Sequence, residues 1–199
     1  TCGVTSALRS KSIGIGLPTV PSVITAPNTN GLCGQLASFG CPAQAGATYN
    51  WTFPAGSTPA SITAGANNVS STMPGAGFVS GSVCVTATNG CGTSNARCIT
   101  VKGTPLTPGV ITPTPGTWCA PTAGVNFVGN IASLTGVYTL NWTVIPASAV
   151  SSPIGQGTNN YTVDWDNAGS ATVNLTASNA CGSTTRSLAV SVSGCTRVT

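Results

Sequence analysis

The chain has 199 residues with six Lys or Arg, two Asp or Glu and no His, giving a formal net charge of +4 at pH 7. Without His, and with Asp164 and Asp166 as its two carboxylate side chains, it lacks the acid–base pairs, catalytic triads and most metal sites of enzymes. The basic residues are spread along the chain and form no stripe of the kind that nucleic-acid binding requires. We therefore expect no enzymatic activity, no metal or cofactor and no nucleic-acid partner.

The composition also indicates a fold class and a compartment. Hydrophobic residues make up 41% of the chain, and its 25 Gly and 14 Pro favour a folded all-β protein with many turns. Nine Cys without any His indicate disulfides in an oxidising compartment rather than Cys/His zinc sites. No apolar run approaches the length of a membrane span. We expect an exported protein with no membrane span in this segment.

The first segment, residues 1–15, resembles the stretch that follows Cys181, with Cys2-Gly3 standing where Cys181-Gly182 stands. We interpret it as the last strand of a preceding repeat, so that the chain is an excerpt of a longer protein. A strand without its own sheet has a free edge, so a second interpretation is that it completes the sheet of another molecule.

Two repeats follow, which we assign to residues 16–103 and 104–199. Segments of the first recur in the same order in the second, at an offset of roughly ninety residues. The matching segments are PSVITAPNTNGLC (21–33) with PGVITPTPGTWC (108–119), YNWTFP (49–54) with LNWTVIP (140–146), and GSVCVTATNGCGTSNARCITV (81–101) with ATVNLTASNACGSTTRSLAV (171–190).

Within each repeat, apolar residues alternate with polar ones. Leu140, Trp142 and Val144, for example, alternate with Asn141 and Thr143. A period of two is typical of half-buried strands, and clusters of Gly and Pro separate the alternating segments. The pattern predicts an immunoglobulin-like sandwich of two sheets in each repeat.

Particular positions in the sandwich can also be assigned. Trp51 and Trp142 fall where such a sandwich has its third strand, so we interpret both as core anchors rather than ligand-stacking residues. The segments NGCG (89–92) and NACG (179–182) indicate tight hairpins between the last two strands.

Four motifs carry a family resemblance: the entry PGVI (108–111), the core YNWT (49–52), the turn GQGTN (155–159) and the hairpin NACG (179–182). Together they resemble the PKD-like, immunoglobulin-like tandem repeats of Bacteroidota cell-surface proteins of the gliding-adhesin SprB type. The resemblance covers nearly all of residues 16–194. The first repeat departs from it at AGA (64–66) and by its additional Cys residues.

The resemblance implies a large multi-repeat protein at the cell surface, exported across the outer membrane by type IX secretion, with a role in adhesion or gliding motility. Rigid sandwiches joined by Pro-containing linkers such as GTPLTP (103–108) would form a stalk. Its expected partners are a surface polysaccharide or solid substratum, neighbouring repeats, and like chains in a bundle.

Two alternative functions stay open. The chain could be a carbohydrate-binding module accessory to an exported enzyme, for which Trp118 and Trp165 are the Trp residues outside the repeated core motif. It could also be the subunit of an extracellular filament assembled by strand donation.

Alternation also predicts one disulfide inside the first repeat. Val83 and Val85 are expected to point inward, which turns Cys84 outward, and Cys98 faces the same way on the next strand. Since both are equally far along the chain from the hairpin, they should oppose each other, close enough for a cross-strand bridge.

The other cysteines allow more than one pairing. We pair Cys41 with Cys91 at one end of the first domain, Cys119 with Cys195 at the far end of the second, and Cys33 with Cys181 across the domain junction, while Cys2 or Cys119 could form the same link to adjacent repeats. An alternative of equal standing consists of two bridges within domains, Cys33 with Cys91 and Cys119 with Cys181.

Overall fold

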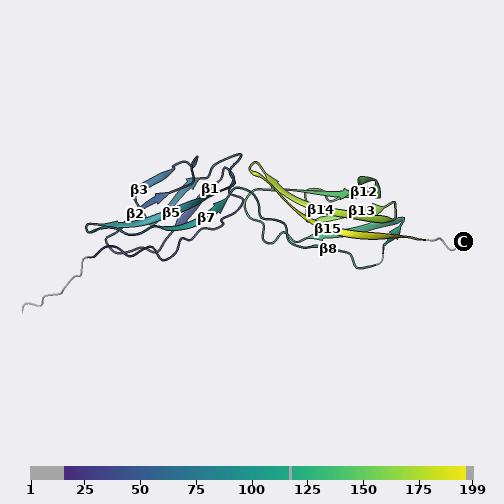
Figure 1. Ribbon diagram of the computed structural model, residues 1–199, viewed down its shortest axis with the longest axis horizontal. Helices are drawn as coiled ribbons and strands as arrows, with labels where there is room; N and C mark the ends of the chain where they lie inside the picture. The colour runs from purple at the N-terminus through teal and green to yellow at the C-terminus, as the bar shows by residue number, and fades with distance from the viewer. Residues whose placement is uncertain (1–15, 117, 196–199) are drawn as a thin grey trace, which may run out of the picture.

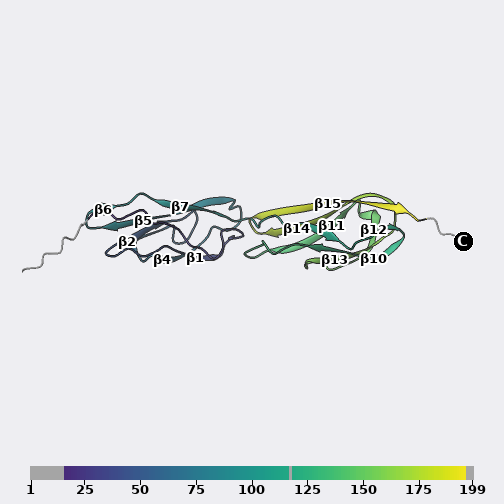
Figure 2. The ribbon, with the colours of Figure 1, turned by 90° about the horizontal axis from the view of Figure 1, so that it is seen from below.

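The computed structural model describes residues 16–116 and 118–195 and shows two β-sandwich domains arranged end to end (Figure 1). The turned view in Figure 2 shows the same elongated arrangement. The strand expected in residues 1–15 lies outside the described residues.

The first domain is built from two antiparallel sheets. Its strands are β1 (Leu36–Gly40), β2 (Thr48–Thr52), β3 (Ser61–Gly65), β4 (Asn68–Thr72), β5 (Ser80–Asn89), β6 (Gly92–Thr93) and β7 (Arg97–Lys102). One sheet has the order β3-β2-β5, with β6 and β7 both pairing with β5, and the other consists of β1 and β4.

The second domain has two four-stranded sheets. Its elements are β8 (Ile111–Pro113), β9 (Cys119–Ala120), β10 (Thr122–Gly129), β11 (Thr139–Ile145), the 3₁₀ turn η1 (Ala147–Ala149), β12 (Val150–Ile154), β13 (Asn160–Trp165), β14 (Gly169–Asn179) and β15 (Gly182–Gly194). The sheets have the orders β12-β13-β10-β8 and β11-β14-β15-β9. The predicted all-β fold of tandem immunoglobulin-like sandwiches is confirmed.

Each domain has its own hydrophobic core, centred on one of the repeated tryptophans. Trp51 is fully buried and its Nε1 donates to the Ala66 carbonyl oxygen at 3.1 Å. Trp142 is 1% exposed, stacks on Tyr161 with ring centroids 5.2 Å apart, and donates from Nε1 to the Thr158 oxygen at 2.9 Å. Both side chains thus bury a large apolar surface while their one polar atom stays bonded, which suits a core anchor.

The two repeats differ in the partner of one strand. In the first domain β3 pairs with β2, so Trp51 lies opposite Ile62, whereas in the second domain β12 pairs with β13 in the other sheet. This leaves β11 at the edge of its sheet. The Gln156 side chain covers that edge: its Oε1 accepts from the Trp142 N–H and its Nε2 donates to the Trp142 carbonyl oxygen, each at 2.8 Å. The first repeat has AGA where the second has GQG, so it has no amide that could replace β3.

Gln156→Ala should therefore destabilise the second domain by about 1–2 kcal/mol, the net contribution of two hydrogen bonds at a partly hydrated strand edge. Gln156→Glu keeps an acceptor for the Trp142 N–H but brings a carboxylate oxygen against the Trp142 carbonyl oxygen, so its loss should be at least as large. Urea unfolding followed by tryptophan fluorescence measures both. Equal stability of all three proteins would show that the amide does not support β11.

A disulfide ties β5 to β7 in the first domain. Cys84 and Cys98 are directly opposed in the strand register, with Cα atoms 4.1 Å apart, and they form a disulfide. The second domain has the opposed pair Asn174 and Ser187 on β14 and β15, and Ser187 Oγ donates to Asn174 Oδ1 at 2.6 Å. At equivalent positions, a disulfide joins the two strands in the first domain and a side-chain hydrogen bond joins them in the second.

Replacing Cys84 and Cys98 together by Ala should lower the opening free energy of β7 by about 2–3 kcal/mol, because the bridge closes a short loop. The matched variant Cys84→Asn with Cys98→Ser introduces the pair of the second domain and should recover about 1 kcal/mol. Native-state hydrogen exchange of the β7 amides measures this opening. Unchanged protection in the Ala variant would contradict the prediction.

Candidate functional site at the domain junction

The structure pairs six of the cysteines in three disulfides: Cys33–Cys181, Cys84–Cys98 and Cys119–Cys195. Cys119 and Cys195 lie at the end of the second domain away from the junction, where β9 runs parallel to the end of β15. The alternative bridges of Cys33 with Cys91 and of Cys119 with Cys181 do not form, since these cysteines have other partners or, for Cys91, none.

The expected Cys41–Cys91 bridge is wrong. Both residues are free thiols: Cys41 is buried in the core of the first domain, whereas Cys91 is exposed at the tip of the β5–β6 hairpin. Cys41 continues the inward-facing positions Ala37 and Phe39 of β1, and that alternation was the sequence signal that could have placed it. Burial also raises the pKa of the Cys41 thiol, which lowers its reactivity.

The chain crosses between the domains in a short segment held by backbone hydrogen bonds. Lys102, at the end of β7, donates to the Thr29 carbonyl oxygen at 2.8 Å and accepts from the Leu32 N–H at 3.1 Å. Gly31 then donates to the Thr104 oxygen at 3.2 Å. The linker is therefore packed along the loop of residues 29–32 and does not act as a free tether.

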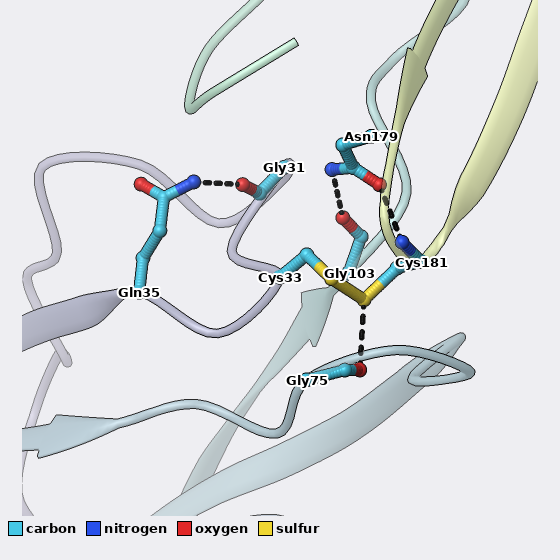
Figure 3. Close-up of a disulfide and its surroundings, with 7 residues drawn as sticks. All are labelled: Gly31, Cys33, Gln35, Gly75, Gly103, Asn179 and Cys181. Carbon is cyan, nitrogen blue, oxygen red and sulfur yellow. Dashed lines mark hydrogen bonds between the residues drawn. A yellow bond between two sulfur atoms is a disulfide. The ribbon is translucent and has the colours of Figure 1, made fainter.

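The β14–β15 hairpin of the second domain holds the same linker from the other side (Figure 3). Asn179 donates from Nδ2 to the Gly103 carbonyl oxygen at 2.8 Å, and its Oδ1 accepts from the Cys181 N–H at 2.9 Å. One side chain thus fixes both the crossing point of the chain and the turn that carries the cysteine.

The rest of β15 continues this attachment of the incoming chain. Thr184 donates from Oγ1 to the Leu106 carbonyl oxygen at 2.9 Å, and Arg186 donates from Nε to the Pro108 oxygen at 3.0 Å. Side chains of β15 therefore hold the chain by hydrogen bonds where it enters the second domain.

The disulfide between Cys33 and Cys181 joins the two domains covalently. Their Cα atoms are 5.7 Å apart although 148 positions separate them in sequence. Gln35 supports the loop that carries Cys33 by donating from Nε2 to the Gly31 oxygen at 2.7 Å (Figure 3). The Cys181 sulfur lies 2.9 Å from the Gly75 carbonyl oxygen, and since a disulfide sulfur carries no hydrogen we interpret this as a close contact.

Two glycines allow the backbones of the domains to approach each other. Gly31 and Gly136 have φ values of 69° and 81°. A Cβ at Gly31 would collide with the Thr135 carbonyl oxygen, and one at Gly136 would collide with that of Gly31. Thr135 also donates from Oγ1 to the Asn30 oxygen at 3.2 Å. Glycine is thus required here both by conformation and by space.

Trp118 and Trp165 do not form an exposed pair on which a sugar could stack. Trp165 is 1% exposed, and the half-buried Trp118 stacks on it with ring centroids 6.5 Å apart. The other Trp, Tyr and Phe side chains are buried or half-buried as well. The platform that a carbohydrate-binding module needs is therefore not formed by Trp118 and Trp165.

The two carboxylates have structural partners. Asp164 accepts from the Gly124 N–H at 2.7 Å, and Asp166 accepts from Ser151 Oγ at 2.9 Å. Among residues 16–116 and 118–195, no three His, Cys, Asp or Glu side chains gather in a way that could hold a metal ion. Over the same ranges, no helix has the length and apolar character needed to cross a membrane.

Several solved structures are similar to this chain. The FN1–FN3 domains of chicken CNTN1 are 12% identical over 89% of this chain and 68% of theirs, with a TM-score of 0.33. A two-domain fibronectin type III segment of chicken tenascin is 12% identical over 86% and 99%, with a TM-score of 0.36. Domains 4 and 5 of the S-layer protein SbsC are 16% identical over 77% and 82%, with a TM-score of 0.32.

The family comparison is more specific. No curated protein matches the chain. A family model described as a PKD-like domain matches residues 17–101 and again residues 104–192. Domains of this kind are typically non-catalytic and often extracellular. An extracellular location agrees with the three disulfides in the structure. The chain belongs to the PKD-like domain family.

Proposed function

We propose that this chain is a rigid segment of a cell-surface stalk or adhesin, of the gliding-adhesin type found in Bacteroidota, and that it has no enzymatic role. The observation that carries the proposal is the covalently closed domain junction, in which Cys33 and Cys181 join two domains already connected by their linker. Two tandem domains joined by a linker alone are expected to move relative to each other. A second covalent connection removes most of that freedom.

The junction combines three restraints that act on the same few residues. The linker is bonded to loop 29–32, Asn179 holds the Gly103 oxygen, and Gly31 and Gly136 are in backbone contact. Bending the junction would break these contacts together. A segment of this kind transmits force and keeps its length, which a stalk requires.

The surface composition supports an adhesive role in addition to that of a stalk. The chain is rich in Ser, Thr and Asn, and its charged residues make up 4% of the sequence. Hydroxyl and amide groups on the outer faces would form weak, additive contacts with a surface polysaccharide, a solid substratum or like chains in a bundle. The disulfides favour a location outside the cytoplasm, reached by export across the outer membrane. A filament assembled by strand donation is the alternative, and the mass of the native polypeptide distinguishes a long repeat protein from a small subunit.

We expect the oxidised chain to tumble in solution as one elongated body. ¹⁵N relaxation should give both domains one common diffusion tensor, and the double variant Cys33→Ser with Cys181→Ser should give each domain its own, shorter correlation time. The double variant Cys84→Ser with Cys98→Ser removes a bridge inside one domain and should keep the common tensor. Independent tumbling of the unmodified oxidised chain would overturn the rigid-stalk proposal.

Adhesion should depend on the density of the chain. Beads coated densely with the chain should resist flow on polysaccharide-coated or glass surfaces, while sparsely coated beads detach, because weak contacts add up only when many act together. Dense coats that hold no better than uncoated beads would contradict an adhesive role without affecting the stalk.

A further inference from the structure

The outer end of the first domain carries the same hairpin that forms the junction in the second. Asn89 accepts from the Cys91 N–H at 2.8 Å and donates from Nδ2 to the Gly16 oxygen at 2.9 Å. Asn179 makes the same two bonds, to Cys181 and to Gly103, at 2.9 and 2.8 Å. Gly16 therefore holds the position in the first domain that the linker residue Gly103 holds in the second.

The chain that follows Gly16 also takes the path of the linker. Leu17 lies beside Gly92 as Thr104 lies beside Gly182. Arg97 donates from Nε to the Pro21 oxygen at 3.2 Å, as Arg186 does to the Pro108 oxygen. A repeat attached to Gly16 would thus meet the first domain in the direction in which the first domain meets the second.

The glycine that permits close approach is present as well. Gly46, in the loop between β1 and β2, has a φ of 72°, and Gly136, in the loop between β10 and β11, has a φ of 81°. Gly136 packs against Gly31, whereas a Cβ at Gly46 would find no heavy atom within 4 Å. Within residues 16–116 and 118–195, nothing covers Gly46, so the equivalent contact surface is open there.

The hairpin cysteines differ only in their state. Cys181 is bonded to Cys33 of the adjacent domain, and Cys91, at the equivalent position, is an exposed thiol. The junction between the two domains thus shows what this set of groups binds. It binds the opposite end of a repeat, the end that carries loop 29–32 and Cys33 in the first domain.

We propose that the outer end of the first domain, formed by Asn89, Cys91, Gly92 and Gly46, is a docking site for another PKD-like repeat, and that Cys91 forms a disulfide with the cysteine of that repeat that corresponds to Cys33. The partner must have this cysteine free. The second domain of another copy does not fit, because its corresponding residue, Cys119, is bonded to Cys195. The occupant is therefore a repeat of the first-domain type, in which this cysteine has no partner within its own domain.

The bond forms by thiol–disulfide exchange with an organic disulfide as the oxidant. The Cys91 thiolate attacks this disulfide and releases one thiol, and the thiolate of the partner repeat then attacks the mixed disulfide and releases a second thiol. Two protein thiols are oxidised to one disulfide, and the oxidant is reduced to two thiols. The inference extends the proposed stalk by naming the partner of one end, and it is independent of adhesion.

A chain with one additional repeat tests the site. Residues 16–103 are placed directly before residues 17–199, so that the added Gly103 takes the place of Gly16. After oxidation with oxidised glutathione, non-reducing peptide mapping should find the added Cys33 bonded to the original Cys91. In the same map, the free and glutathione-bound forms of the original Cys91 should fall at least tenfold, while the added Cys91, with no repeat before it, should stay free or bound to glutathione.

Two variants serve as controls. With Cys33→Ser in the added repeat, the original Cys91 should stay free or bound to glutathione. Gly46→Asn in the original first domain tolerates a positive φ but adds a side chain to the docking surface, so it should slow formation of the bond severalfold. The Cys84–Cys98 bridge of the added repeat, read in the same peptide map, reports that this repeat has folded.

The proposal is overturned if the original Cys91 stays free or bound to glutathione while the added repeat holds its Cys84–Cys98 bridge. Cys91–Cys91 bridges between molecules would equally overturn it, since they would mark an unspecific surface thiol. The native protein gives a second measurement that does not need the added repeat. Its Cys91 peptide should be linked to a peptide from another repeat, and a free Cys91 thiol would contradict the inference.

Discussion

The Asn179 side chain joins the two domains at the point where the chain crosses between them. Its amide holds the carbonyl oxygen of Gly103, where the chain leaves the first domain, and its oxygen shapes the turn at Cys181. These two bonds fix the Cys181 Cα at a distance from that of Cys33 at which a disulfide can form. The disulfide then holds covalently the two loops that these hydrogen bonds bring together.

Much of the fold was predictable because alternation in a strand directly reports which face is buried. The burial of Trp51 and Trp142 follows from that period, and the opposition of Cys84 and Cys98 follows from it together with their equal distance from the hairpin. The partner of β12 was not predictable, because it depends on whether a Gln156 amide or a whole strand covers the edge of β11. The spacing of the cysteines likewise could not decide between disulfides within a domain and disulfides between domains. It depends on which loops meet at each end, and on Cys41 pointing into the core rather than to the hairpin.

The bridges also lie where a load along the chain would act. Figure 1 shows β15 running from the junction toward the far end of the second domain. Cys119–Cys195 ties the end of β15 to β9, and Cys84–Cys98 ties β7 to β5 just before the linker. Cys33–Cys181 bypasses the linker itself. A pull on the chain therefore passes from one domain to the next through covalent links, and the sheets between them are loaded along their strands, where many hydrogen bonds share the force.

The two repeats differ in one residue that decides whether a junction can be locked. In the strand registers Val83 lies opposite Ile99 and Val173 opposite Leu188, so the position of Cys195 after the second repeat's last strand corresponds to Leu106, in the linker that follows the first repeat. Because Leu106 is no cysteine, Cys33 finds no partner there and bonds to Cys181. Cys119 has such a partner, so the outer end of the second domain presents no thiol from this position. A single position after the last strand thus determines whether the preceding cysteine closes its own domain or joins it to the next, which would let tandem PKD-like repeats combine stiff and flexible junctions with little change in sequence.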